Sequence, residues 1–287
     1  MNRVKAESFI KDWLPKKVYV YLFKRFADLQ FFSFNKKELI KANKSLKNTK
    51  KGKRCFMIAT GPSLKLENLK LLENEDCYTI SNAFLHEDIK VINPLAHFYA
   101  PYHEPLILDN YLDWLQKSDK ELPERTKIVT GHKNIPFIES REGLFKNRKV
   151  EYLFLARHTD AFNDISKPIM PPINGPQMMI PYLLYLGYSE IYLLGCDSTV
   201  MRDYKKANIT HFYDSKKKDV RKNASDQNSW SKAVDQFKYQ YDHFKVYEHF
   251  NSHPTIQSGE QKILNLSQDS WIDSYPFETL DHIIQKG

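Results

Sequence analysis

The stretch Arg54-Cys55-Phe56-Met57-Ile58-Ala59-Thr60-Gly61-Pro62-Ser63-Leu64 decides the fold that we expect for this chain. Its apolar run is typical of a buried strand, which breaks at Thr-Gly-Pro-Ser and is followed by a helical pattern through Leu72. A strand, a tight turn and a helix bring backbone N–H groups together at a helix N-terminus, where they bind anions. An ordinary strand-to-helix turn has the same pattern, so the interpretation depends on the rest of the chain.

The turn itself contains residues that suit a phosphate. Gly61 lacks the Cβ that would block the close approach of a ligand. Pro62 fits the first turn of a helix, and Ser63 can cap the helix or donate a hydrogen bond to phosphate. We therefore expect Thr60, Gly61, Pro62 and Ser63 to contribute to a nucleotide-binding site.

Length and composition indicate a globular α/β protein. The 287 residues are 41% hydrophobic and 27% charged, which suits one large domain with an appendage or two modest domains. No window reaches the roughly 18 apolar residues of a membrane-spanning helix, and we find no secretory signal. Cys55, Cys77 and Cys196 lie in apolar surroundings without paired spacing. They predict buried thiols in a reducing compartment, the cytoplasm, with neither disulfides nor a zinc site.

Positive charge is concentrated at one end of the chain. The net charge is +8, but residues 1–54 carry sixteen Lys and Arg against four Asp and Glu, so the remainder is slightly acidic. This distribution argues against a nucleic-acid enzyme. Aromatic and basic residues alternate between positions 8 and 34, as in amphipathic helices on anionic membranes. A helix that packs on the body and exposes its basic face would have the same composition.

The rest of the chain alternates strands with helices. This order predicts a doubly wound, mostly parallel, Rossmann-like sheet. We expect a basic helical arm at 1–50 with a linker or exposed turn at 43–53, a catalytic domain at 51–287, and a loop or lid at about 199–229. The expected strands lie at 54–59, 77–81, 96–100, 127–130, 151–155, 189–195 and 262–266, and the expected helices at 63–72, 104–116, 177–186, 230–250 and after residue 276.

Polar residues follow several of these strands, where ligands bind in parallel sheets. Asn82 and the pair Asn174-Gly175 could read a base, ribose or phosphate, although an Asn in such a place is often a helix cap. Asp197 could bind a metal ion or a sugar hydroxyl, or cap the next segment. No second acid forms a DxD pattern with it, which argues against a metal-diphosphate site.

The loop after Asp197 holds the best candidates for catalysis. His211 is the preferred general base, because imidazole takes up a proton near neutral pH. Tyr204 and Tyr213 could hydrogen-bond a leaving phosphate without a metal ion. The alternative is an exposed polar loop with His211 on the surface. No GxGxxG, Walker A, HExxH or GxSxG element occurs, which weakens the dehydrogenase, P-loop kinase, zinc protease and α/β-hydrolase interpretations.

Three segments resemble the bacterial sialyltransferases of glycosyltransferase family 42. The segment 59–64 is similar to the family's Asn-Gly-Pro-Ser-Leu opening, and 187–197 is similar to its Gly-Tyr-Lys-Glu-Ile-Tyr-Leu-x-Gly-Ile-Asp strand. Asn82 occupies the position of a family Asn that reads the cytidine nucleotide. Thr60 and Ala100 depart from the pattern, since each stands where the family has Asn, and His211 lacks the family's Gly-His-Ser setting.

The resemblance implies an inverting, metal-independent transferase with a His base and two Tyr residues on the leaving phosphate. It would move a CMP-activated sugar, expected to be a nonulosonic-type acid, onto a surface-glycan acceptor of lipopolysaccharide or capsule. It implies no cofactor beyond the donor. Such acceptors are often attached to lipid, so we expect the enzyme at a peripheral position on the inner membrane. A homo-oligomer is also possible.

Two other functions stay open. The chain also resembles 6-hydroxymethylpterin diphosphokinase-like proteins, which would imply ATP-dependent and magnesium-dependent diphosphoryl transfer. Few clustered carboxylates are available to hold the magnesium, so this function ranks second. The third possibility is a non-catalytic nucleotide-binding protein that docks on the membrane through its basic arm.

Overall fold

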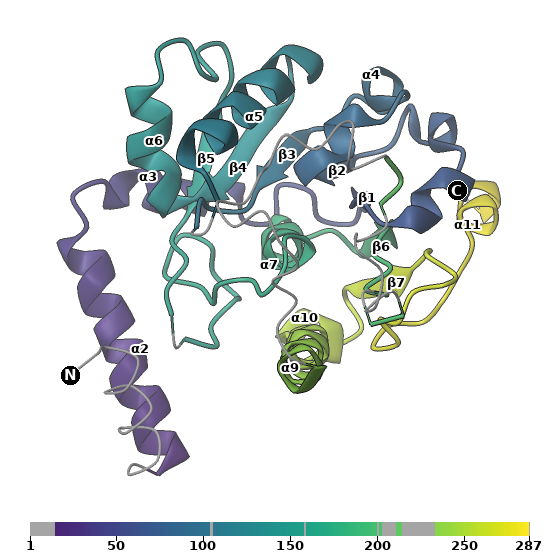
Figure 1. Ribbon diagram of the computed structural model, residues 1–287. Helices are drawn as coiled ribbons and strands as arrows, with labels where there is room; N and C mark the ends of the chain where they lie inside the picture. Colours follow the sequence, from purple (N-terminus) through teal and green to yellow (C-terminus); the bar gives the residue numbers. More distant parts are fainter. Residues whose placement is uncertain are drawn as a thin grey trace.

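The computed structural model describes residues 15–103, 106–157, 159–199, 201–202, 211–213 and 233–286. Within them, seven strands form one sheet in the order β5-β4-β3-β2-β1-β6-β7, and every neighbouring pair is parallel (Figure 1). The predicted Rossmann-like α/β fold is confirmed. The strands are β1 (Arg54–Ile58), β2 (Cys77–Ile80), β3 (Ala96–Tyr99), β4 (Lys127–Gly131), β5 (Val150–Leu153), β6 (Glu190–Leu194) and β7 (Lys262–Asn265).

Helices cover both faces of the sheet. Alternate strand residues point to opposite faces, and because both sets are largely apolar, each face is buried by helices. Cys55 and Met57 of β1 join a core that includes α7 (Pro176–Leu186) and α9 (Ala233–Phe250), whereas Phe56 and Ile58 face the other core. Figure 1 shows α7 and α9 on one side of the sheet and α5 and α6 on the other. The second core includes residues of α3 (Lys37–Lys41), α4 (Ile89–Ile92), α5 (Leu108–Glu121), α6 (Ile135–Ser140) and α11 (Leu280–Lys286).

Two sequence signals are confirmed in the core. The apolar run before Gly187 forms α7, and Gly187 ends this helix with a left-handed φ of 88°. The three cysteines are buried free thiols, and burial raises the pKa of Cys55, Cys77 and Cys196. These thiols are therefore protonated packing residues at neutral pH.

The helix predicted between Ser63 and Leu72 is replaced by two short 3₁₀ helices, η2 (Pro62–Leu66) and η3 (Leu69–Leu72). Glu67 and Asn68 adopt extended backbone angles between them, and the Asn68 side chain accepts the Lys70 N–H. This local bond competes with a continuous helix. The turn after β1 consequently has no long helix behind it to strengthen an anion site.

The segment 43–53, expected to be a linker or an exposed turn, contains an exposed turn at 47–52, and it belongs to the body instead of forming a separate linker. It follows α3 through the 3₁₀ helix η1 (Ala42–Leu46). Asn43 is buried, and its amide donates to the carbonyl oxygens of Tyr152 at 2.8 Å and Ile165 at 3.1 Å. The backbone N–H of Lys50 donates to Leu186. The chain therefore joins the body before residue 43, not at a flexible connection.

Helix α2 (Lys16–Ser33) extends along one edge of the molecule (Figure 1). Its inner face is attached near its C-terminal end, where Ala27 is buried and Phe31 contacts Phe154 with ring centroids 5.1 Å apart. Its outer face is apolar as well: Leu29 is 65% and Phe32 75% exposed. In the described residues, none of the helices is both long and apolar enough to cross a membrane.

The remaining short elements are η4 (Ser81–Leu85) directly after β2, η5 (His132–Asn134) directly after β4, and α10 (Pro254–Gln257) between α9 and β7. A cavity lies at the carboxyl edge of the sheet, where β1 and β6 end.

Candidate active site

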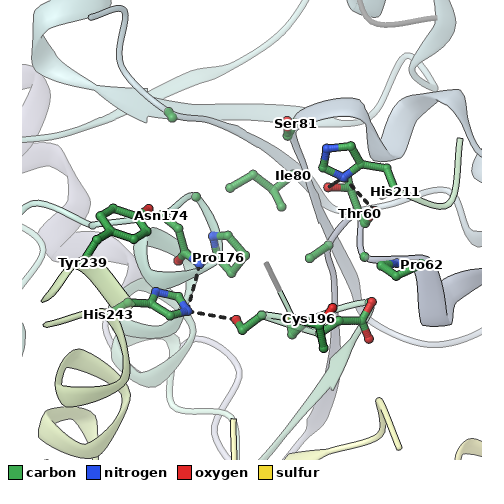
Figure 2. Close-up of a pocket in the computed structure, with 18 of the residues that line it drawn as sticks. Thr60, Pro62, Ile80, Ser81, Asn174, Pro176, Cys196, His211, Tyr239 and His243 are labelled. Atoms are coloured by element: carbon green, nitrogen blue, oxygen red, sulfur yellow. Dashed lines mark hydrogen bonds between the residues drawn. The ribbon is translucent and has the colours of Figure 1, made fainter. Parts of the chain in front are cut away.

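A cavity of about 320 Å³ lies at the carboxyl ends of the strands (Figure 2). Residues that follow four strands line it: Thr60 after β1, Ser81 after β2, Ala100 after β3 and Asp197 after β6. Strand order reverses between β1 and β6, since β2 to β5 lie on one side of β1 and β6 and β7 on the other. Ligands of open α/β sheets bind at this kind of switch point.

The Gly61 turn is packed against Asp197. A Cβ at Gly61 would lie 1.9 Å from Asp197 Oδ2 and 2.6 Å from the Gly195 carbonyl oxygen. The same Oδ2 accepts the backbone N–H of Ser63 at 3.0 Å. The missing Cβ of Gly61 thus makes room for the Asp197 side chain. The sequence analysis expected a ligand in this space, but atoms of the protein fill it.

Asp197 has two roles in this arrangement. Its Oδ2 caps the turn after β1 and not the segment that follows Asp197, which was the cap expected from the sequence, and the residue also lines the cavity. Only 3% of the residue is exposed, and burial raises the pKa of its carboxyl while the hydrogen bonds from Ser63 lower it. Its Oδ1 atom has no hydrogen-bond partner among the described residues. Asp197 therefore carries a buried carboxylate oxygen without a hydrogen-bond partner among the described residues, next to the cavity.

His211 lies on the cavity wall beside Thr60, as Figure 2 shows. Its Nδ1 is 3.2 Å from the Thr60 carbonyl oxygen and 3.4 Å from Thr60 Oγ1. A carbonyl oxygen only accepts, so Nδ1 carries the hydrogen and Nε2 the lone pair of the neutral ring. The ring stacks on Tyr213 with centroids 4.9 Å apart and planes 3° apart. His211 is half-buried and oriented, unlike a surface residue of an exposed loop.

Asn82 and Tyr213 lie behind this wall. Asn82 is 0% exposed, donates to the Tyr213 hydroxyl at 2.8 Å and accepts from the Trp114 indole N–H. Both ends of its amide are therefore used within the protein. Asn82 holds Tyr213, and Tyr213 supports the ring of His211, whereas Ser81 is the neighbour that lines the cavity. Tyr204, the other predicted phosphate partner, lies outside the described residues.

The opposite wall contains Asn174, Gly175 and a histidine that the sequence analysis did not select (Figure 2). Gly175 brings the start of α7 against the sheet, since a Cβ there would lie 2.8 Å from Ile80 Cδ1. His243 of α9 contacts Ser198 Oγ through Nε2 at 2.9 Å and lies 3.4 Å from Asn174 Nδ2. No motif marks His243, because it belongs to a long helix with an ordinary amphipathic pattern.

The described residues contain no group of three or more His, Cys, Asp or Glu side chains that could hold a metal ion. Asp197 supplies a carboxylate to the cavity, and Pro62 and Pro176 supply apolar surface. The cavity thus combines apolar surface with a few polar side chains, among which His211 and His243 lie on different walls.

Together, the fold and the cavity define an α/β protein with a ligand site at the carboxyl edge of its sheet. No family model and no curated protein matches the chain. Similar solved structures include the sialyltransferase CstII from Campylobacter jejuni with the substrate analogue CMP-3FNeuAc, at 16% identity and a TM-score of 0.42 over 78% of this chain and 85% of that one. The monofunctional α-2,3-sialyltransferase Cst-I from Campylobacter jejuni is 18% identical, with a TM-score of 0.42 over 79% and 81%.

A structure of the sialyltransferase CST-II with a trisaccharide acceptor and CMP is also similar, at 18% identity and a TM-score of 0.43 over 78% of this chain and 85% of that one. At these TM-scores the likeness says nothing about the reaction of this chain, whose function is argued below from its own residues.

Proposed function

We propose that this chain is a glycosyltransferase that moves a nonulosonic-type acid from a CMP-linked donor to a glycan hydroxyl. The observation that carries the proposal is the oriented His211, whose Nδ1 lies 3.2 Å from the Thr60 carbonyl at the wall of the strand-end cavity. The motifs around Gly61 and Asp197, which resemble family 42, converge on the same wall.

The reaction would be a direct displacement with inversion. The acceptor oxygen would attack the anomeric carbon as the bond from that carbon to the CMP phosphate oxygen breaks. The acceptor proton would pass to Nε2 of His211, the nitrogen that the Thr60 contact leaves with the lone pair. Hydrogen bonds would stabilise the leaving phosphate without a metal ion, and we assign Tyr204 to this task. Tyr213 would orient the base by stacking on it.

A nucleotide screen tests the donor class. CMP should stabilise the chain in the presence of a chelator, and a ligand at 100 times its dissociation constant adds about 2.7 kcal/mol to the free energy of unfolding. The melting temperature should therefore rise measurably. If only ATP with magnesium stabilised the chain and CMP did not, the diphosphokinase function would be favoured over this proposal. Stabilisation without turnover of any donor would support the non-catalytic nucleotide-binding protein.

We propose further that α2 holds the enzyme on the anionic inner face of the membrane, where lipid-linked acceptors are reached from the cytoplasm. Its outer face exposes large apolar side chains, beside the cations Lys24 and Arg25. Apolar burial and about 1 kcal/mol per Lys or Arg near an anionic surface favour such binding. The exposed apolar residues are Val18, Tyr21, Leu22, Phe26, Leu29 and Phe32.

Vesicle sedimentation tests this position. Removing residues 1–50 would also remove the buried Ile40 and Asn43, so surface substitutions are the better change. The full chain should sediment with anionic vesicles at low salt, and the variant Leu29→Ser with Phe32→Ser should stay in the supernatant. Leu66→Ser, at an apolar residue 83% exposed on η2, is the matched control and should sediment like the unchanged chain. The alternative is that α2 is an oligomer contact. In that case the unchanged chain would stay in the supernatant, and the double variant would have a smaller oligomeric state than the unchanged chain and Leu66→Ser.

A further inference from the structure

Two serines at the cavity have a left-handed backbone. Ser81 follows β2 with a φ of 58°, and Ser198 lies after β6 with a φ of 52°. These angles are unfavourable for a residue with a Cβ, and they gather at functional sites. Asn48, Asn93 and Phe145 are the other described non-glycine residues of this kind, and none of them lines the cavity. The two serines thus keep a strained backbone at the place where a ligand would lie.

A buried histidine fixes the backbone of Ser81. His97 of β3 is 0% exposed, and its Nε2 donates to the Ser81 carbonyl oxygen at 2.9 Å. Its Nδ1 therefore holds the lone pair and accepts the Thr79 hydroxyl hydrogen at 2.7 Å. Burial lowers the pKa of His97 to about 3, so the ring is neutral near pH 7. The Ser81 side chain lies at the cavity (Figure 2), and its hydroxyl has no hydrogen-bond partner within the described parts of the chain.

A second histidine fixes the side chain of Ser198. The backbone N–H of Ile173 donates to Gln177 Oε1 at 2.9 Å, so Gln177 Nε2 is a donor to His243 Nδ1 at 3.1 Å. Burial lowers the pKa of His243 to about 4, so the ring is neutral near pH 7. Its Nε2 must then carry the hydrogen, which it donates to Ser198 Oγ at 2.9 Å. Asn174 Nδ2 lies 3.4 Å from the same ring nitrogen and, as a donor itself, does not compete.

These contacts leave the hydroxyl hydrogen of Ser198 to a ligand. His243 cannot accept it, because Nε2 already carries a hydrogen. No other hydrogen bond joins Ser198 Oγ to a residue that the structure describes. The donors from Gln177 through His243 to Ser198 all point in one direction, and such a chain polarises its last hydroxyl. A hydroxyl of this kind donates most strongly to a negatively charged oxygen.

The described lining of the cavity offers few other contacts to such an oxygen. It contains no Lys or Arg. Its one acidic side chain is Asp197, which is bonded to the Ser63 N–H through Oδ2 and buried at Oδ1, so it is not presented to a ligand. The proposed donor carries two acidic groups, the phosphate of CMP and the carboxylate of the sugar acid. Hydrogen bonds from O–H and N–H groups are therefore what this lining can supply to them.

We infer that Ser81 and Ser198 donate hydrogen bonds to acidic oxygens of the nucleotide-sugar donor, and that His97 and His243 are their positioning residues. Each serine acts from its own side of β1, since β2 and β6 flank that strand. The inference rests on the proposed function, which supplies the phosphate and the carboxylate. No covalent step is involved.

Replacing each serine with glycine separates ligand contact from strain. Glycine adopts both backbone angles freely, so Ser81→Gly and Ser198→Gly should melt no lower than the unchanged chain. In calorimetric titration each should bind a CMP-linked sialic acid about 10-fold or more weakly, the effect of one hydrogen bond to a charged group. A purely structural serine would not give lower affinity without lower stability. Asn93→Gly, at a φ of 41° away from the cavity, is the matched control and should keep the original affinity.

Three probes assign the oxygen that each serine contacts. If it belongs to the phosphate, the glycine variant should weaken CMP and the CMP-linked sialic acid alike and leave cytidine, which lacks the phosphate, unaffected. If it belongs to the carboxylate, only the CMP-linked sialic acid should weaken. An equal loss with cytidine would place the hydroxyl on the nucleoside and overturn the inference for that serine.

The positioning histidines have a readout that does not depend on a ligand. Long-range ¹H–¹⁵N NMR should find the ring hydrogen on Nε2 in His97 and His243, and on Nδ1 in His211. His243→Phe should weaken the same probe as Ser198→Gly, and the double variant should lose no more than Ser198→Gly alone, because His243 acts through Ser198. A hydrogen on Nδ1 of His97 or His243 would overturn the positioning role of that histidine, and additive losses would do so for His243.

The two proposals fail in different ways. If AMP binds in place of CMP and the glycine variants weaken AMP but not adenosine, the donor class is wrong and the serine contacts stand. If the CMP-linked sialic acid binds and reacts but both glycine variants bind it like the unchanged chain, the serine contacts are overturned and the transferase stands. If no nucleotide binds, both proposals are wrong.

Discussion

Replacing His211 with alanine is expected to slow sugar transfer by about 10²- to 10⁴-fold, the usual contribution of a general base. The Thr60 carbonyl fixes Nδ1 as the protonated nitrogen, so the lost group is the acceptor at Nε2. His211 is only one of the many residues that line the cavity. The affinity for CMP should therefore stay within a few-fold of that of the unchanged chain. The comparison of initial transfer rates with nucleotide affinity separates the base from a binding residue.

His282→Ala is a suitable control for this variant, because His282 lies in α11, outside the cavity, and pairs with Glu278 just before that helix. It should transfer at the original rate. A His211→Ala variant with full turnover would show that another group takes the acceptor proton.

Gly61→Ala is expected to destabilise the fold by about 3 kcal/mol, at the upper end of the usual cost of overpacking a filled site. The added Cβ would meet Asp197 Oδ2 at 1.9 Å and the Gly195 carbonyl oxygen at 2.6 Å. Asp197 must move, which breaks its bond to the Ser63 N–H. Thermal unfolding should therefore show a melting temperature lower by roughly 6 °C or more, together with a loss of transfer.

Gly259→Ala is the matched control. A Cβ at Gly259 would meet nothing within 4 Å, so its cost is confined to the left-handed φ of 78° and should be smaller, about 1 kcal/mol. If Gly61→Ala melts like the unchanged chain, the packing of the turn against Asp197 is not what positions this wall.

The fold could be predicted because its signals are local. Each buried strand is a short apolar run followed by a turn, and the run before Gly187 has the length and the cap of a helix. The parallel sheet then places the residues after the strands on one edge. This reasoning brought Thr60, Asp197 and Asn174 to one cavity before any contact was known.

The contacts inside the site could not be predicted, because they join residues far apart in the sequence. Asn82 looks like a ligand reader in its own segment, and only the fold brings Tyr213 and Trp114 to its two ends. His243 depends in the same way on Gln177 and Ser198. Gly61 was selected correctly as a place of close approach, but the approaching group is the carboxylate of Asp197.

The central claim is that the cavity between β1 and β6 transfers sugar from a CMP-linked donor with His211 as the base. The most direct measurement is CMP release from a CMP-linked sialic acid, with a panel of glycan acceptors and a chelator present. The proposal predicts acceptor-dependent release by the full chain and a loss of about 10²-fold or more in His211→Ala. The proposal would be contradicted if no acceptor led to CMP release and the chain instead consumed ATP in the presence of magnesium.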